Sequence, residues 1–134
     1  MPLSVAFMLG VITLVSAFDS SSWVYSIPVF VSNGSGADLA NQPVPVAMNP
    51  LALITNGYLA SNAADLRTTN ASNALLPNVA QSTGTNNADW WFDADSVTNG
   101  SLGQFTFYTG NSAATSNQAI RLANVAGSVT DSLT

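Results

Sequence analysis

The clearest pattern in the chain runs from Trp23 to Val31, where every second residue is a large apolar one, and it stops at the turn residues 33–36. This period of two predicts a β-strand. One face of that strand carries Trp23, Tyr25, Ile27, Val29 and Val31. Pro28 has no backbone N–H to donate, so we expect the strand to lie at the edge of a sheet or to place Pro28 where the ladder needs no bond.

Further short apolar runs are separated by Gly, Asn and Pro. They predict strands at residues 44–48, 58–60, 65–68, 75–79, 89–93, 104–108 and 119–123. Residues 51–54 fit either one helical turn or a short strand. Short strands at such spacings indicate an all-β fold, an antiparallel β-sandwich of jelly-roll type. We assign residues 19–125 to this sandwich and 126–134 to a flexible tail or linker.

Residues 1–18 form an apolar N-terminal segment, which ends where Asp19 begins a polar stretch. A secretory signal has such a core, and residues 15–17 are small enough for cleavage, but no Lys or Arg precedes the core. A membrane span needs about 20 apolar residues, more than this stretch supplies. We therefore expect an assembly segment, with a secretory signal or a pilin-like helix as alternatives. Its expected contact residues are Leu3, Val5, Phe7, Leu9 and Val11.

The charge content narrows the function. All seven acidic residues are Asp, both basic residues are Arg, and Glu, Lys, His and Cys are absent. Without imidazole or thiolate groups most catalytic and zinc chemistries have no ligands or nucleophiles, so we expect no enzyme and no cofactor. A net charge of -5 with two isolated Arg also disfavours binding to nucleic acid or to an anionic membrane.

A series of landmarks resembles the DUF2341 family of bacterial, archaeal and phage surface domains. They are Trp23-Val24-Tyr25, the turn 33–36, Leu39 to Val44, Ala64 to Arg67, Leu75-Leu76-Pro77, Trp90-Trp91-Phe92 and Tyr108 to Ala114. The chain departs from the family pattern at Asn78 and Thr109, where an aromatic residue is usual. The resemblance implies a β-sandwich at a surface and no established activity; such domains often precede lectin-like sandwiches in adhesins and phage fibre proteins.

Two acidic patterns are candidate sites. Asp65 and Arg67 would share one face of a strand, where they form a structural pair or hold a loop, or where Arg67 binds a polar ligand. Asp89, Asp93 and Asp95 are weak candidates for Ca²⁺ binding, because carboxylate oxygens suit that ion. No Glu is present to supply a bidentate ligand, so solvated Asp residues at strand ends are the plainer interpretation.

Aromatic residues suggest an interface. Trp90 and Trp91 are adjacent on a predicted strand and should face opposite sides, so at most one of them lies in the core and the other is exposed or covered by a partner. A sugar-stacking platform is an alternative use of exposed rings. Its candidates are Trp23, Trp90, Trp91, Tyr25, Tyr58 and Tyr108. Three Asn residues, Asn33, Asn70 and Asn99, match the pattern for N-glycosylation.

Together these patterns predict a non-enzymatic structural or attachment protein of a phage or virus particle, on the virion surface or outside the cell. Its expected partners are copies of itself or other particle proteins, because a surface with so little charge tends to associate. A secreted filament subunit that uses donor-strand complementation and a module that binds cell-surface glycans are the alternatives.

Overall fold

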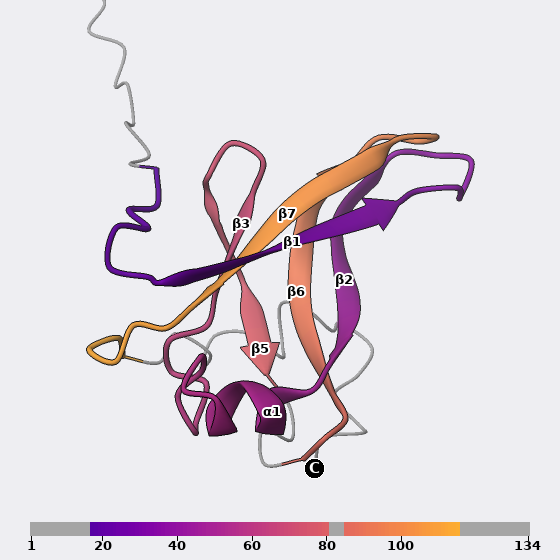
Figure 1. Ribbon diagram of the computed structural model, residues 1–134. Helices are drawn as coiled ribbons and strands as arrows, with labels where there is room; N and C mark the ends of the chain where they lie inside the picture. The colour runs from indigo at the N-terminus through magenta and orange to yellow at the C-terminus, as the bar shows by residue number, and fades with distance from the viewer. Residues whose placement is uncertain (1–16, 81–84, 116–134) are drawn as a thin grey trace, which may run out of the picture.

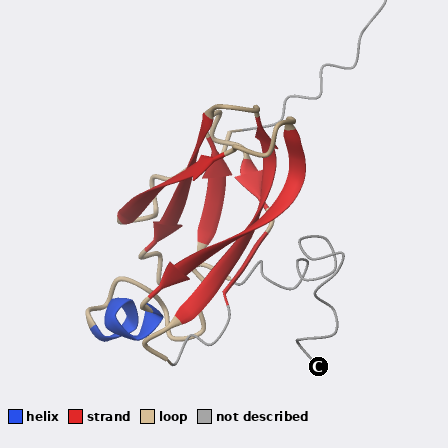
Figure 2. Cartoon of the chain, turned by 90° about the vertical axis from the view of Figure 1, so that its right-hand side faces the viewer, coloured by secondary structure: helices blue, strands red, loops and turns tan. Residues whose placement is uncertain are grey.

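The structure, a computed structural model, describes residues 17–80 and 85–115, which form two antiparallel β-sheets packed face to face (Figure 1, Figure 2). The strands are β1 (Tyr25–Ser32), β2 (Leu39–Met48), β3 (Arg67–Asn70), β4 (Leu75–Leu76), β5 (Asn78–Ala80), β6 (Ala88–Val97) and β7 (Leu102–Thr109). A short helix, α1 (Pro50–Thr55), lies at one end of the sandwich. The expected antiparallel sandwich is confirmed, while the jelly-roll connectivity stays a prediction.

The first sheet has the strand order β1-β7-β3-β4 and the second the order β2-β6-β5. β1 is thus an edge strand, and it pairs with β7 from Tyr25 opposite Thr109 to Ser32 opposite Leu102. Pro28 therefore stands in an edge strand, as its missing N–H led us to expect. β2 forms an edge of the second sheet and also contains two prolines, Pro43 and Pro45.

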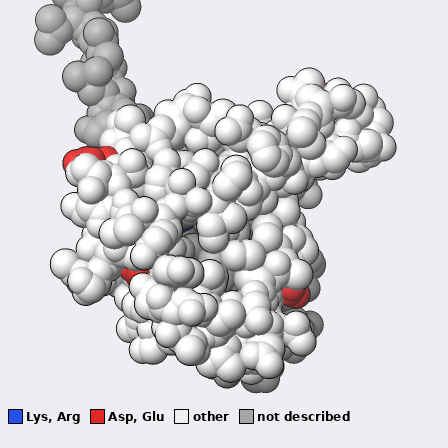
Figure 3. Space-filling model, in the orientation of Figure 1, with Lys and Arg blue, Asp and Glu red and all other residues white. Residues whose placement is uncertain are grey.

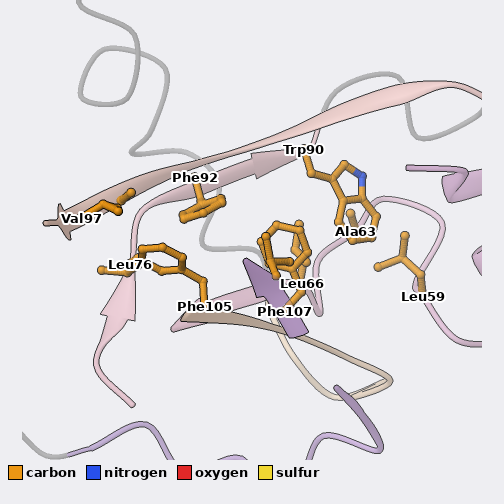
Figure 4. Packing of buried hydrophobic residues seen from close by; sticks show 11 residues of the cluster. Leu59, Ala63, Leu66, Leu76, Trp90, Phe92, Val97, Phe105 and Phe107 are labelled. Carbon is orange, nitrogen blue, oxygen red and sulfur yellow. The ribbon is translucent and has the colours of Figure 1, made fainter. Parts of the chain in front are cut away.

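Aromatic side chains fill the space between the sheets (Figure 4). Trp90 and Phe92 come from β6, and Phe105 and Phe107 come from β7; none is more than 1% exposed. The ring centroids of Phe92 and Phe105 are 4.8 Å apart, and Phe107 meets Phe92 edge-on at 5.7 Å. Burial of such large apolar side chains is the main stabilising contribution to a small sandwich.

Most of the predicted strands are present with different limits. The runs 44–48, 89–93 and 104–108 lie within the longer strands β2, β6 and β7, and residues 51–54 belong to α1. β3 begins at Arg67 rather than at Asp65. The predicted strand 119–123 and the tail 126–134 lie outside the described residues, as do residues 1–16 of the N-terminal segment.

Residues 58–60 were expected to form a strand, and this is wrong. Gly57 has a φ of 76°, its N–H donates to the carbonyl of Ile54, and the N–H of Tyr58 donates to the carbonyl of Leu53. This is the Schellman arrangement that ends a helix at a residue in the left-handed conformation. Tyr58 therefore belongs to the end of α1, and its ring remains at the surface.

The predicted strand 75–79 is divided in two by Pro77. β4 pairs with β3 in the first sheet, whereas β5 pairs with β6 in the second. Proline cannot donate to a strand ladder, so pairing is interrupted at this residue and the chain passes from one sheet to the other. The single residue Pro77 thus connects the two layers of the sandwich.

Residues 17–23 lie against the outer face of the first sheet. The ring of Phe18 contacts Tyr108 at 5.2 Å and Trp23 at 4.8 Å between centroids. The N–H of Phe18 donates to the carbonyl of Asn73, and the Asn73 side chain donates back to the Phe18 carbonyl. These contacts fix the chain entering β1 to the turn between β3 and β4.

Candidate functional site

Arg67 at the start of β3 is buried, and its guanidinium is held by backbone carbonyls. Nη1 donates to the carbonyl oxygens of Ala64 and Leu66, both at 2.8 Å, and Nη2 donates to that of Thr115 at 2.7 Å. The same group lies 5.3 Å from the centroid of the Trp23 ring, a cation–π contact. The guanidinium therefore joins three segments of this chain, and a role in binding a ligand stays a prediction.

Asp65 uses its carboxylate in a similar way. Oδ1 accepts from the N–H of Ala60 at 2.9 Å, and Oδ2 accepts from those of Gly110 and Asn111 at 2.8 and 3.3 Å. The described hydrogen bonds of both side chains go to backbone groups of neighbouring segments, so the two residues hold loops in place. Burial lowers the pKa of Arg67, while attraction to the Asp65 carboxylate opposes this shift.

The two adjacent tryptophans face opposite sides of β6. Trp90 lies fully in the core, where its ring packs against Phe107 at 5.6 Å. Trp91 lies on the outer face, opposite Pro45 of β2 and Val79 of β5, and keeps part of its surface exposed. Of the pair, only Trp91 is placed where a partner would reach it, and its interface role stays a prediction.

The three acidic residues of β6 have different surroundings. Asp89 is exposed, whereas Asp95 accepts from the side chain of Asn70 at 2.7 Å and from the N–H of Ser96 at 3.0 Å. Asp93 is buried; burial first, and then repulsion from Asp95, raises the pKa of its carboxyl. Among residues 17–80 and 85–115 no three His, Cys, Asp or Glu side chains lie close enough together to hold a metal ion, and Ca²⁺ binding stays a prediction.

The three potential glycosylation sites are not equally accessible. Asn33 is buried, and its Nδ2 donates to the carbonyls of Ala37 and Val97 at 2.8 Å each. The Nδ2 of Asn70 donates to Asp95. Asn99 is exposed, and its side chain uses only Oδ1, which accepts from the N–H of Gly36 at 3.1 Å. Because a sugar is attached at Nδ2, Asn99 is the site most open to modification in the folded chain.

The surface carries very little charge. Arg67 is the only Lys or Arg in the described part of the chain, and it is buried, so this part exposes no basic side chain. The face in Figure 3 is covered almost entirely by uncharged residues, with acidic side chains at isolated positions. Attraction of polyanions would therefore have no basic side chain to act through on the described surface.

Large apolar side chains are exposed instead. Phe30 of β1 is 56% exposed and Leu102 of β7 is 61% exposed. Because Phe30 stands opposite Gln104 and Ser32 stands opposite Leu102, both apolar side chains project from the outer face of the first sheet as diagonal neighbours. We call Phe30 and Leu102 the apolar pair. The other exposed large apolar residues are Val24, Tyr25, Leu51, Tyr58 and Leu75.

The ends of β6 and β7 are paired on one side only beside a groove of about 440 Å³, β6 with β2 and β7 with β1. Within the described residues, the other neighbour of β6, β5, reaches only residues 90–92 of β6, and the other neighbour of β7, β3, reaches only residues 105–108 of β7. Residues 95–97 of β6 and 102–104 of β7 therefore lie beyond these neighbours, and both stretches line the groove. Unpaired strand edges are places where another chain can add a strand.

Several features of this surface could not be predicted from the sequence. The apolar pair comes from two strands that are adjacent only in the folded sheet. Tyr25 contacts Tyr58, which follows the end of α1 and was expected to lie in a strand at residues 58–60. The predicted contact residues Leu3, Val5, Phe7, Leu9 and Val11 lie outside the described residues. No helix in the described part of the chain is long and apolar enough to cross a membrane.

Comparison with known proteins adds no relative to this description: family models, curated proteins and solved structures were all searched, and none of them matches the chain.

Proposed function

We propose that this chain is a non-enzymatic structural or attachment module of a phage or virus particle, which packs through apolar surface against copies of itself. The apolar pair is the observation that carries this proposal. Two large apolar side chains, each more than half exposed, stand together on a sheet face. Covering them would remove apolar area from water, which favours association.

The nearly uncharged surface supports the same function. The described surface has no exposed cation and only scattered carboxylates, so the repulsion between copies comes from a few separated negative charges. Amide and hydroxyl groups keep such a surface hydrated without strong repulsion between copies. The resemblance to surface and phage domains points to the same location, on a particle or outside the cell.

Sedimentation velocity of the full chain over a range of concentrations tests this proposal. We expect the average mass to rise with concentration, and the double substitution Phe30→Ser and Leu102→Ser to shift the protein toward the monomer. Leu75→Ser is the matched control, because Leu75 is also exposed, at 49%, but belongs to β4. A chain that stays monomeric up to its solubility limit, or a control that has the same effect as the double variant, contradicts the proposal.

A filament subunit that assembles by donor-strand complementation is the second candidate, and the two unpaired strand edges at the groove favour it. A closed, symmetric oligomer supports the particle module, whereas head-to-tail contacts that do not close produce a filament. Electron microscopy of concentrated protein distinguishes these outcomes. Fibres that persist in the single variant Phe30→Ser, whose changed residue does not line the groove, favour strand addition there.

A further inference from the structure

We propose that a pocket beside Tyr25 and Tyr58, at the end of the sandwich that holds α1, binds a neutral saccharide. The pocket has a volume of about 330 Å³. It is formed where the start of β1, the end of β7 and the loop after α1 come together (Figure 1). Its lining includes Val24, Tyr25, Gly57, Leu59, Ala60, Asp65, Gly110 and Ser112.

The Tyr25 ring lines the pocket, and the Tyr58 ring, which is not itself a lining residue, packs against Tyr25 next to it. Tyr25 is 38% exposed and Tyr58 is 40% exposed, and their centroids are 4.6 Å apart at an angle of 59°. Each ring therefore contacts the other and still offers surface to solvent. Tyrosine combines an apolar ring face with a polar hydroxyl, which suits contact with the C–H face and the hydroxyls of a sugar.

The fold holds Tyr25 in place before any ligand arrives. Gly110 has a φ of 86° and packs against the ring so closely that an added Cβ would lie 2.6 Å from Cδ2 of Tyr25. The Asp65 carboxylate accepts the N–H of Gly110 at 2.8 Å and so fixes the backbone behind the ring. A ring whose position is set in this way loses little conformational entropy when it binds a ligand.

Polar groups complete the site. A carboxylate has about four acceptor positions; Asp65, which is 2% exposed, accepts the N–H of Ala60 at Oδ1 and those of Gly110 and Asn111 at Oδ2 within the described residues. Ser112 adds a hydroxyl at the exposed side of the pocket. A carboxylate and a hydroxyl beside aromatic rings match a ligand that has many hydroxyl groups.

Charge selects the class of saccharide. Asp65 contributes a negative charge to the lining, and no Lys or Arg is among the lining residues. Arg67, the one cation nearby in sequence, is occupied by three backbone carbonyls. A sulfated or carboxylated sugar would meet repulsion without compensation, so a neutral one is favoured.

Calorimetric titration of the full chain with chitotriose, cellotriose, maltotriose and lactose, each alone, tests the proposal, with a sulfated heparin tetrasaccharide as the charged comparison. We expect at least one neutral sugar to bind and the sulfated one to bind more weakly. Tyr58→Ala should weaken binding roughly threefold to tenfold, the value of one aromatic contact. Tyr58 is exposed and follows the helix, so its loss should leave the fold intact, as circular dichroism would show.

Phe30→Ala is the matched control, since Phe30 is also an exposed aromatic residue, at 56%, and lies outside the pocket, so its loss should not affect sugar binding. Tyrosine ring resonances in NMR spectra give a second readout, in which the signals of Tyr25 and Tyr58 should move on titration. The proposal is overturned if no neutral sugar binds, if the sulfated sugar binds most tightly, or if Tyr58→Ala and Phe30→Ala weaken binding equally.

Discussion

Replacing Arg67 by Ala should be among the most damaging single changes in this protein. The substitution leaves the carbonyls of Ala64, Leu66 and Thr115 without the donor that now reaches each of them at 2.7–2.8 Å. Hydrogen bonds to a charged group contribute about 1.5–3 kcal/mol each, and they are not additive when one side chain makes them all. The lost contact with Trp23 adds about 0.5–1 kcal/mol or more.

We therefore expect Arg67→Ala to lower the free energy of unfolding by about 3–5 kcal/mol, a large part of the roughly 5–15 kcal/mol that holds a domain together. Urea titration followed by tryptophan fluorescence measures this loss. In Arg67→Lys the charge is kept, but an ammonium group lacks the planar guanidinium that bonds to several carbonyls at once. The free energy of unfolding of this variant should therefore lie between those of the wild type and Arg67→Ala. If Arg67→Ala costs less than about 1 kcal/mol, the guanidinium does not organise this region and the reasoning is refuted.

Three further predictions concern other residues. Because burial raises the pKa of Asp93 above 3.8 in the folded state, the folded protein holds this proton more tightly than the unfolded chain does. The free energy of unfolding should therefore fall as the pH rises from about the unfolded-state pKa of Asp93 through its folded-state pKa. Urea titrations at several pH values measure this fall, which Asp93→Asn should remove. Gly110→Ala should lower the melting temperature more than Gly57→Ala, because both have positive φ but only at Gly110 would a Cβ clash with a ring; equal losses would contradict this. Asn33→Ala should lower the free energy of unfolding by about 1–3 kcal/mol because it removes buried hydrogen bonds, whereas Asn99→Ala should change it little. Mass spectrometry of protein from a glycosylating host should find sugar at Asn99 and none at Asn33.

The parts of the fold that depend on local periodicity could be predicted from the sequence. Alternation placed Ile27, Val29 and Val31 on the inner face of β1, and adjacency alone required Trp90 and Trp91 to face opposite ways. Both follow from the period of two in an extended chain. The edge position of β1 followed from one proline.

Other parts depended on contacts between distant segments. The partners of Arg67 are carbonyls whose direction is set by the turn before β3 and by the segment after β7, and no pattern of residue types reveals this. The exposure of Phe30 could not be predicted, because alternation assigns residues to two faces of a strand but does not say which face another element covers. Tyr58 looked like part of a strand because the helix-ending role of Gly57 depends on its backbone angle.

The passage of the chain through Pro77 also bears on how the protein unfolds. Strands β4 and β5 are separated by this one residue, yet each belongs to the hydrogen-bond ladder of a different sheet. Unfolding of either sheet would disrupt the strand pairing of the other sheet and expose the aromatic core to water. Amide protons on both layers should therefore exchange with solvent at a common rate, as in a unit that opens all at once.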